Sequence, residues 1–318
     1  MAAGRADRVD PVRRARRPAG PAHPGHPGPA GGRVTDLIEV RRAGPLTTVQ
    51  DLGRRGYAHL GVPRSGALDP AALALANRLV GNPVSAAGLE ITLTGCELRP
   101  TRAVTVAVTG ADADVRVGPR PGDVGRALAV PAGAVLRLGP ARDGLRNWLA
   151  VSGGIAVEPV LGSRATDTLS GLGPPPVRDG DRLPLGPWPG PPPPVDVTVG
   201  RPPTGELRLA LRPGPRADWF TPDALDRLFG TPYTVSPVGD RVGARLTGAP
   251  LPRSVAGELP SEGIVLGAVQ VPADGQPLVF LADHPTTGGY PVIGVVDDVT
   301  ALAQARPGTT VRFHGPQR

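Results

Sequence analysis

Short apolar runs, rather than long amphipathic repeats, dominate the chain from residue 37 onward. The runs alternate with polar positions or are wholly apolar, and turns that contain Gly and Pro separate them, as is typical of β-strands. The most apolar of them cover residues 89–93, 103–110, 134–139 and 147–154. The pattern therefore predicts a mainly β fold in which these runs form core strands.

Residues 69–81 carry the clearest helix signals in the sequence. Asp69 suits the N-cap and Pro70 the first helical position, because Pro lacks the N–H that would be unpaired there. An Ala- and Leu-rich run follows, and Gly81 suits the C-terminal stop. We therefore predict a helix over residues 69–81.

Weaker signals add a few shorter elements. Residues between Pro222 and Gly230 favour a short helix, and residues 299–306 favour another. The apolar runs 268–271 and 277–282 flank the turn sequence Pro-Ala-Asp-Gly, which predicts a hairpin.

Composition divides the chain into four parts. Residues 1–34 consist mainly of Arg, Pro, Gly and Ala, which cannot offset the entropy of ordering, and are expected to be disordered. An N-terminal β lobe is expected over residues 35–189, a Pro-rich linker over 190–205, and a C-terminal β lobe over 206–318. A chain that starts at Val34 should fold and function like the full chain.

The formal charge of +7 does not indicate nucleic-acid binding. Residues 1–34 alone carry a net charge of +5, so the other 284 residues carry only +2. A nearly neutral folded part has no excess of Lys and Arg to contact a phosphate backbone. No run of eighteen apolar residues is present, so a membrane-spanning helix is not expected, and the cytoplasm is the expected compartment.

The chain contains no lysine and one cysteine, Cys96. It therefore cannot form a Schiff base, carry biotinyl-lysine or supply a phosphate-loop lysine. An intramolecular disulfide and a cysteine-based metal cluster are equally impossible, and no metal site is predicted. If biotin or ATP takes part in its function, another chain must supply those parts.

A candidate site lies in residues 258–294. The second strand of the predicted hairpin delivers Asp283 and His284 to its end, and a Thr-Thr-Gly-Gly-Tyr loop follows at once. Ionisable groups beside glycine-rich backbone are typical of a ligand site. The alternative is a simple bend, in which Gly288 and Gly289 turn the chain and Asp283 caps the turn.

Four sequence segments resemble the biotin-dependent carboxyltransferase family. ELPSEG, GAVQVPADGQP and TTGGYP follow one another within residues 258–291, and GPLTTVQDLGRRGYAHLGVPRSGALDPAALALANRLVGN spans residues 44–82. The resemblance extends over roughly residues 37–313. It implies a mainly β structure with two barrel-like lobes of the cyclophilin-like type, a few short helices, and a second, similarly folded partner protein.

The resemblance implies two main activities. Members include the C-type subunit of 5-oxoprolinase, a three-protein assembly that opens 5-oxoproline to glutamate with ATP, and urea carboxylase domains, which transfer a carboxyl group from carboxybiotin to urea. Many relatives have a basic residue, often lysine, where Val292 stands, and often Gln where Pro285 stands, so these departures count against a lysine-dependent carboxybiotin site. The sequence also contains no biotin-carboxylase module or biotinylation motif, which favours a component of 5-oxoprolinase that works with A-like and B-like partner subunits. The alternatives are a urea-pathway carboxyltransferase with a separate biotin carrier, or a non-catalytic regulator that binds a protein of the B-like type.

Opening a lactam needs a group that handles the proton and donors that stabilise the oxyanion. Asp283, Glu262 and His284 are the candidates for the first role, and Asp283 is expected at a loop edge. The candidates for substrate binding are Gln50, Asp51, Arg54, Ser65, Arg241, Gln270, Gly288, Gly289 and Tyr290.

Three further features have open interpretations. Arg164, Thr166 and Asp167 form either a local cluster of ion pairs and hydrogen bonds or a ligand site. Glu90 is expected on an exposed strand face rather than in a site. Arg245, like Arg241, either binds a carboxylate or lies on a solvated strand face.

Overall fold

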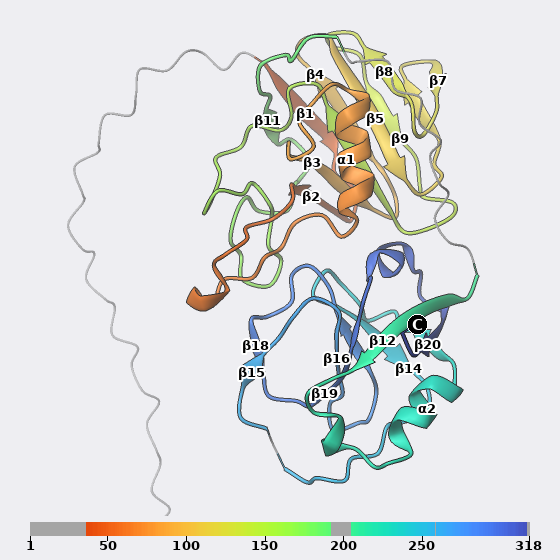
Figure 1. The fold of residues 1–318 in the computed structure, drawn as a ribbon. Coiled ribbons are helices and arrows are strands. Elements are labelled where there is room, and N and C mark those ends of the chain that lie inside the picture. The colour runs from red at the N-terminus through yellow and green to blue at the C-terminus, as the bar shows by residue number, and fades with distance from the viewer. Residues whose placement is uncertain (1–35, 192–204, 258, 317–318) are drawn as a thin grey trace, which may run out of the picture. The chain divides into compact units, whose positions relative to one another are not determined.

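The computed structural model describes residues 36–191, 205–257 and 259–316. The predicted disordered extension lies outside the described residues, as does nearly all of the predicted Pro-rich linker. The described part before this gap forms two sheets, and the part after it forms a barrel (Figure 1).

Two antiparallel sheets in the N-terminal part share one hydrophobic core. The first has the strand order β11-β1-β4-β9-β6-β7 and the second the order β2-β3-β10-β5-β8. The strands of the first sheet are β1 Leu37–Arg42, β4 Cys96–Pro100, β6 Val115–Val117, β7 Arg120–Gly122, β9 Leu136–Leu138 and β11 Arg182–Pro184. The strands of the second are β2 Leu46–Gln50, β3 Gly88–Thr92, β5 Val104–Gly110, β8 Ala127–Val130 and β10 Arg146–Val151.

The burial pattern differs between the two sheets for a physical reason. In β4 buried and half-buried positions alternate, because a strand with one face on the core turns every second side chain away from it. Every residue of β10 is buried. This strand lies between β3 and β5, and helix α1, residues Pro70–Leu79, packs against both β5 and β10 (Figure 1).

The signals that predict α1 are visible in its geometry. Oδ1 of Asp69 accepts a hydrogen bond from the backbone N–H of Ala72 at 2.8 Å, and Pro70 is the first helical residue. Gly81 follows the end of the helix with φ of +77°, a conformation that favours glycine. The helix is thus fixed at both ends by local sequence.

A closed barrel in the order β12-β19-β16-β17-β14-β13-β20 forms the C-terminal part. It closes through the parallel pair β12 and β20, whereas the other neighbouring pairs are antiparallel. The mainly β prediction is confirmed. The strands are β12 Leu207–Pro213, β13 Tyr233–Val235, β14 Gly243–Thr247, β16 Ala268–Gln270, β17 Leu278–Phe280, β19 Val292–Val296 and β20 Thr310–His314.

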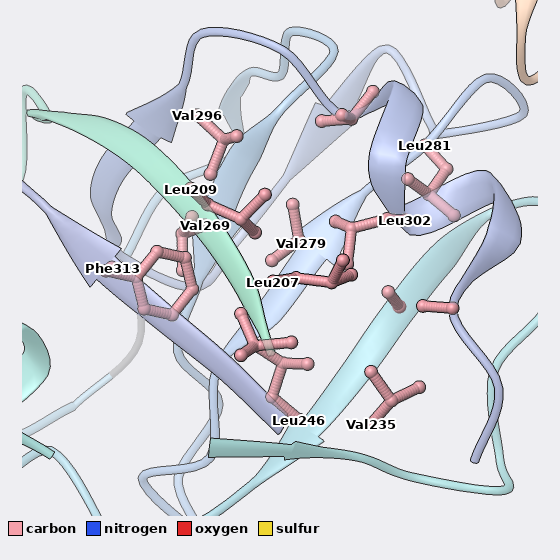
Figure 2. Packing of buried hydrophobic residues seen from close by; sticks show 14 of the residues in the cluster. Leu207, Leu209, Val235, Leu246, Val269, Val279, Leu281, Val296, Leu302 and Phe313 are labelled. Atoms are coloured by element: carbon pink, nitrogen blue, oxygen red, sulfur yellow. The ribbon is translucent and has the colours of Figure 1, made fainter. Parts of the chain in front are cut away.

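Aliphatic side chains, together with Phe220, Tyr233 and Phe313, make up most of the hydrophobic cluster of the barrel. Figure 2 shows Leu209, Val269, Val279 and Phe313 among the residues that pack there, and each is almost fully buried. Trp148 on β10 belongs to the same hydrophobic cluster, so the barrel and the second sheet share part of a core. Truncating a buried leucine or phenylalanine in such a core costs about 2–5 kcal/mol.

The remaining elements are short. Helix α2 covers Ala224–Gly230 and therefore begins two residues later than Pro222, while residues 299–306 form not an α-helix but the 3₁₀ helix η3, Thr300–Gln304. The predicted hairpin is present as the antiparallel pair β16 and β17. Two further 3₁₀ helices, η1 Ala58–Leu60 and η2 Ala217–Trp219, and a ribbon of β15 Glu262–Gly263 with β18 Thr287–Gly288 complete the described elements.

Candidate functional site

Two loops that carry predicted site residues meet next to the barrel. The backbone N–H of Ser65 donates to the carbonyl of Ala282 at 3.1 Å, and the N–H of Asp283 donates to the carbonyl of Arg241 at 3.0 Å. Ser65 precedes α1, whereas Ala282 and Asp283 follow β17. The fold therefore brings together Ser65, Arg241 and Asp283, three residues that were predicted to share one site.

Arg241 is the centre of a group of charged side chains that we call the buried charge network: Glu90, Arg146, Arg241 and Asp283. The Arg241 side chain is 1% exposed. Its Nε lies 3.0 Å from Oδ2 of Asp283 and its Nη2 3.0 Å from Oδ1, a bidentate pair. Its Nη1 donates to Oε1 of Glu90, and Nη2 also donates to the carbonyl of Gly66 at 2.6 Å. The guanidinium is thus committed to two carboxylates of its own chain.

The expectation that Glu90 lies on an exposed face is wrong, because its side chain is 1% exposed. It lies on β3, between β2 and β10 in the second sheet. Its Oε2 accepts hydrogen bonds from the N–H of Leu68 at 2.9 Å and from Nε1 of Trp148 at 3.1 Å, and its Oε1 lies 3.7 Å from Nε of Arg146. Charge-assisted hydrogen bonds thus compensate its burial.

The expectation that Asp283 lies at a loop edge is also wrong, because the residue is completely buried. Besides its pair with Arg241, Oδ1 accepts from the hydroxyl of Ser65 at 2.7 Å, and Oδ2 accepts from the N–H and hydroxyl of Thr168 at 2.9 and 2.7 Å. Burial alone would raise the pKa of Asp283, but Arg241 and these hydrogen bonds hold it below the ordinary 3.8. A carboxylate so saturated is a poor proton acceptor.

A cavity of about 150 Å³ lies beside this network, and we call it the Arg64 pocket. Its polar side chains include Arg64 and His284, and its apolar wall contains Leu68 and Leu266. The full lining is Arg64, Ser65, Ala67, Leu68, Pro70, Leu266, Ala282, His284, Val296, Asp297, Asp298, Val299 and Thr300.

His284 is 7% exposed, and its Nδ1 lies 2.7 Å from the carbonyl of Pro285. A carbonyl can only accept, so Nδ1 carries the proton and Nε2 is the acceptor nitrogen. Burial lowers the pKa of His284 below 6.5, partly opposed by the Pro285 carbonyl and by Asp283, while Arg64 lowers it further. The imidazole is therefore neutral at pH 7, with a lone pair that can take a proton.

Arg64 is the cation of the pocket and lies outside the set of residues selected from the sequence. The residue is half-buried, and its buried Nε has no hydrogen-bond partner among the described residues. Burial and the neighbouring Arg55 lower the pKa of Arg64, although an arginine stays charged. The residue after it, Ser65, has a φ of +53°, an uncommon value for a residue other than glycine, and such backbone clusters at functional sites.

Three of the predicted substrate-binding residues contact backbone and thereby shape loops. Asp51 accepts from the hydroxyl of Ser163 at 2.6 Å and from the N–H of Arg164 at 2.6 Å. Nε2 of Gln50 donates to the carbonyl of Thr166 at 3.0 Å, and Nη2 of Arg54 donates to the carbonyl of Ala165 at 2.5 Å. The Ser65 hydroxyl lies 2.9 Å from the same Thr166 carbonyl, which connects these loops to the network.

Arg164 and Asp167 form the hydrogen bonds of the expected structural cluster, and no ion pair joins them among the described residues. Nε of Arg164 donates to the carbonyl of Val157 at 2.7 Å, and Oδ1 of Asp167 accepts from the N–H groups of Leu169 and Ser170 at 2.9 and 3.0 Å. These contacts stabilise a turn. Arg245 on β14 is exposed, as expected for a solvated strand face.

The other predicted residues lie around the ribbon of β15 and β18. Glu262 forms an ion pair with Arg216, whose hydrogen bond lowers the pKa of Glu262, and its side chain is 31% exposed. Nε2 of Gln270 donates to the carbonyl of Tyr290 at 2.9 Å. A Cβ on Gly288 would lie 2.8 Å from that Nε2, so the Gln270 side chain would have to move to accept one, whereas a Cβ on Gly289 would come no nearer than 3.2 Å to any atom.

Tyr290 is the most accessible of the predicted site residues in the loop, at 44% exposed, with Cζ of Arg253 5.8 Å from its ring centroid. No hydrogen bond among the described residues connects Glu262 with Asp283 or His284. The predicted proton-transfer residues therefore divide: Asp283 lies in the buried charge network, His284 in the Arg64 pocket, and Glu262 at the ribbon.

Two wider properties of the described residues bear on the chemistry. None of their helices has the length and apolar character needed to cross a membrane. Nor do His, Cys, Asp and Glu side chains gather anywhere in the described ranges in a set of three that could hold a metal ion.

Comparison with known proteins gives a consistent result. The family described as carboxyltransferase domain, subdomain A and B, matches residues 60–315. The C subunit of 5-oxoprolinase from Escherichia coli (strain K12) is 38% identical over 87% of this chain and 90% of that protein. The corresponding protein of Haemophilus influenzae is 32% identical, again over 90% of its length. Urea amidolyase of Saccharomyces cerevisiae is 31% identical over 87% of this chain but only 16% of that enzyme.

Solved structures agree with these matches. The crystal structure of TTHA0988 superposes with a TM-score of 0.81 and 38% identity over 90% of this chain, which spans 57% of the TTHA0988 chain. The urea amidolyase of K. lactis superposes with a TM-score of 0.81 and 27% identity, and this chain spans 19% of it.

Proposed function

Because the chain belongs to the carboxyltransferase family of subdomains A and B, we propose that it is the C-type subunit of a 5-oxoprolinase. The assembly would open the lactam ring of 5-oxoproline to glutamate and would use ATP. This chain would act beside A-like and B-like partner subunits, in the cytoplasm.

The observation that carries the proposal is the match in length. The chain covers 90% of two proteins named as the C subunit of 5-oxoprolinase, but 17% and 16% of two urea amidolyases. If the chain acted in the urea pathway, it would correspond to less than a fifth of a urea amidolyase, and other proteins would have to supply the rest. The absence of lysine also means that any biotin would have to be carried by another chain.

The geometry supports a division of labour among the predicted residues. His284 has a neutral imidazole in a cavity, so it would accept the proton of the water that attacks the lactam carbonyl carbon. Breaking the C–N bond then requires that the ring nitrogen gain a proton, which the imidazolium can return. Asp283 and Arg241 would hold the two loops in register rather than touch substrate.

Reconstitution tests the proposal. The full chain would be combined with the A-like and B-like proteins of the same organism, and glutamate release from 5-oxoproline measured with and without ATP. Release that requires all three proteins and ATP is expected. Absence of glutamate with a stable assembly would contradict the proposal, and a complex with the B-like protein alone would then favour the regulatory role.

The urea-pathway role is tested in parallel. The same assembly, supplied with a carboxylated biotin carrier and urea, should show no loss of carboxybiotin. Urea-dependent decarboxylation of the carrier would favour the alternative over 5-oxoprolinase.

A further inference from the structure

The cation of the Arg64 pocket, the Arg64 guanidinium, has no partner among the described residues of the pocket wall. Both acidic side chains in its wall are already engaged: Oδ1 of Asp297 pairs with Nε of Arg212 at 2.8 Å, and Oδ1 of Asp298 accepts from the N–H of Thr300 at 2.8 Å. No ion pair connects any described carboxylate with Arg64, and its Nε is buried without a partner. A half-buried guanidinium in this state is a ready partner for an anion that enters the cavity.

The walls also restrict which anion fits. A cavity of about 150 Å³ is the size that accepts a small ring such as benzene. Asp297 and Asp298 also lie in the wall, and a dianion such as phosphate would meet about twice the repulsion from them that a singly charged ligand meets. Ala67, Leu68 and Val299 add apolar wall that suits ring carbons rather than a bare inorganic ion.

We infer that the Arg64 pocket binds a small cyclic monocarboxylate, with the Arg64 guanidinium paired to the carboxylate and the imidazole of His284 facing the polar edge of the ring. This assignment rests on the proposed function, since 5-oxoproline combines one carboxylate with a five-membered lactam. It goes further by naming the residue that selects the carboxylate, and Arg64 lies outside the set predicted from sequence.

The backbone at Ser65 explains how Arg64 is held in place. Ser65 is fixed by its N–H bond to Ala282 and by the contacts of its hydroxyl with Asp283 and Thr166. Its φ of +53° is maintained by these contacts. Arg64 therefore projects from a segment that the buried charge network holds rigidly, so little ordering would be needed on binding.

Calorimetric titration of the full chain, alone and together with its partner proteins, tests the inference. The probes are 5-oxoproline and 2-pyrrolidinone, which has the same lactam without the carboxylate. We expect 5-oxoproline to bind and 2-pyrrolidinone to bind at least tenfold more weakly, the scale of a lost charge-assisted pair. Equal binding of both probes, or no 5-oxoproline binding in either form of the protein, would overturn the inference.

Variants assign the effect to the pocket. Arg64→Gln should weaken 5-oxoproline binding at least tenfold, whereas Arg55→Gln, at an exposed neighbouring arginine, should leave it unchanged. If Arg64→Gln proves unstable in a thermal melt, Leu266→Trp serves instead. Leu266 lines the pocket and is 38% exposed, so a larger side chain there should block binding without disturbing the core. Unchanged binding in a folded Arg64→Gln or Leu266→Trp protein would contradict the assignment.

The results separate the two proposals. Arg64-dependent binding without glutamate release by the full assembly would contradict the 5-oxoprolinase function but not the carboxylate site. Glutamate release with a KM for 5-oxoproline that Arg64→Gln leaves unchanged would support the function and reject the site.

Discussion

The buried charge network and the Arg64 pocket adjoin each other through consecutive residues, Asp283 and His284, yet the side chains of these two residues are in opposite states. In the network, the Asp283 carboxylate has hydrogen bonds from Arg241, Ser65 and Thr168. In the pocket, no described residue donates to Nε2 of His284, and Nε of Arg64 has no partner. Saturated groups fix a structure, whereas unsaturated groups at a cavity are available to a ligand.

The largest effect should come from breaking the network at its centre. Arg241→Met would leave two buried carboxylates, Glu90 and Asp283, without their shared cation, and removing one partner of a buried pair costs about 3–5 kcal/mol. Urea denaturation should show this loss in the free energy of unfolding. Arg245→Met on the same segment is the matched control, because Arg245 is exposed, and it should change stability by less than about 0.5 kcal/mol. A stable Arg241→Met protein would mean that the network contributes little.

Asp283→Asn separates a structural from a catalytic role at the same place. The amide keeps the shape but loses the charge opposite Arg241, so we expect a loss of roughly 3 kcal/mol in the free energy of unfolding. Glutamate release per folded molecule should fall far less than hundredfold. A hundredfold loss of turnover at unchanged stability would instead restore Asp283 as the proton-transfer residue that the sequence suggested.

His284→Asn should lower activity and leave stability nearly unchanged, the reverse of the result expected for Asp283→Asn. An asparagine amide can still donate to the Pro285 carbonyl but cannot accept a proton, so glutamate release should fall about hundredfold while the melting temperature stays close to that of the parent chain. His59→Asn, at an exposed histidine on η1, should retain full activity. Retained turnover in His284→Asn would remove the imidazole from the chemistry.

These contrasts also show what sequence could predict. The α1 boundaries were accessible because Asp69, Pro70 and Gly81 act through neighbouring backbone, and the core strands were accessible as apolar runs. The burial and pairing of Glu90 and Asp283 could not be predicted, because Arg241, which contacts both, is 151 residues from Glu90 and meets it only in the folded chain. Local sequence made Asp283 resemble a turn cap at a surface.

The candidate site was predictable in part for the same reason. Ser65, Arg241, Asp283 and His284 were all selected from the sequence, and they do converge. Arg64 was overlooked because its neighbours resemble an ordinary turn. Its candidacy as an anion-binding residue depends on its having no counterion among the described residues, which the sequence does not show. The signal available in the sequence was that Arg64 lies within the segment of residues 44–82 that resembles the family.

The smallest predicted effect is a pH dependence of stability that belongs to His284 alone. Its pKa in the folded chain lies below the ordinary 6.5, mainly because burial disfavours the charged imidazole. As the pH falls through 6.5, the unfolded chain therefore takes up a proton that the folded chain resists, and stability declines. Asp283 has the same sign in a different window, because its lowered pKa makes its contribution disappear only below 3.8. Unfolding midpoints measured between about pH 8 and pH 5 should thus decline in the parent chain and decline less in His284→Asn. Identical profiles for the two proteins would show that the imidazole is solvated. The pocket would then not be the enclosed site inferred from its geometry.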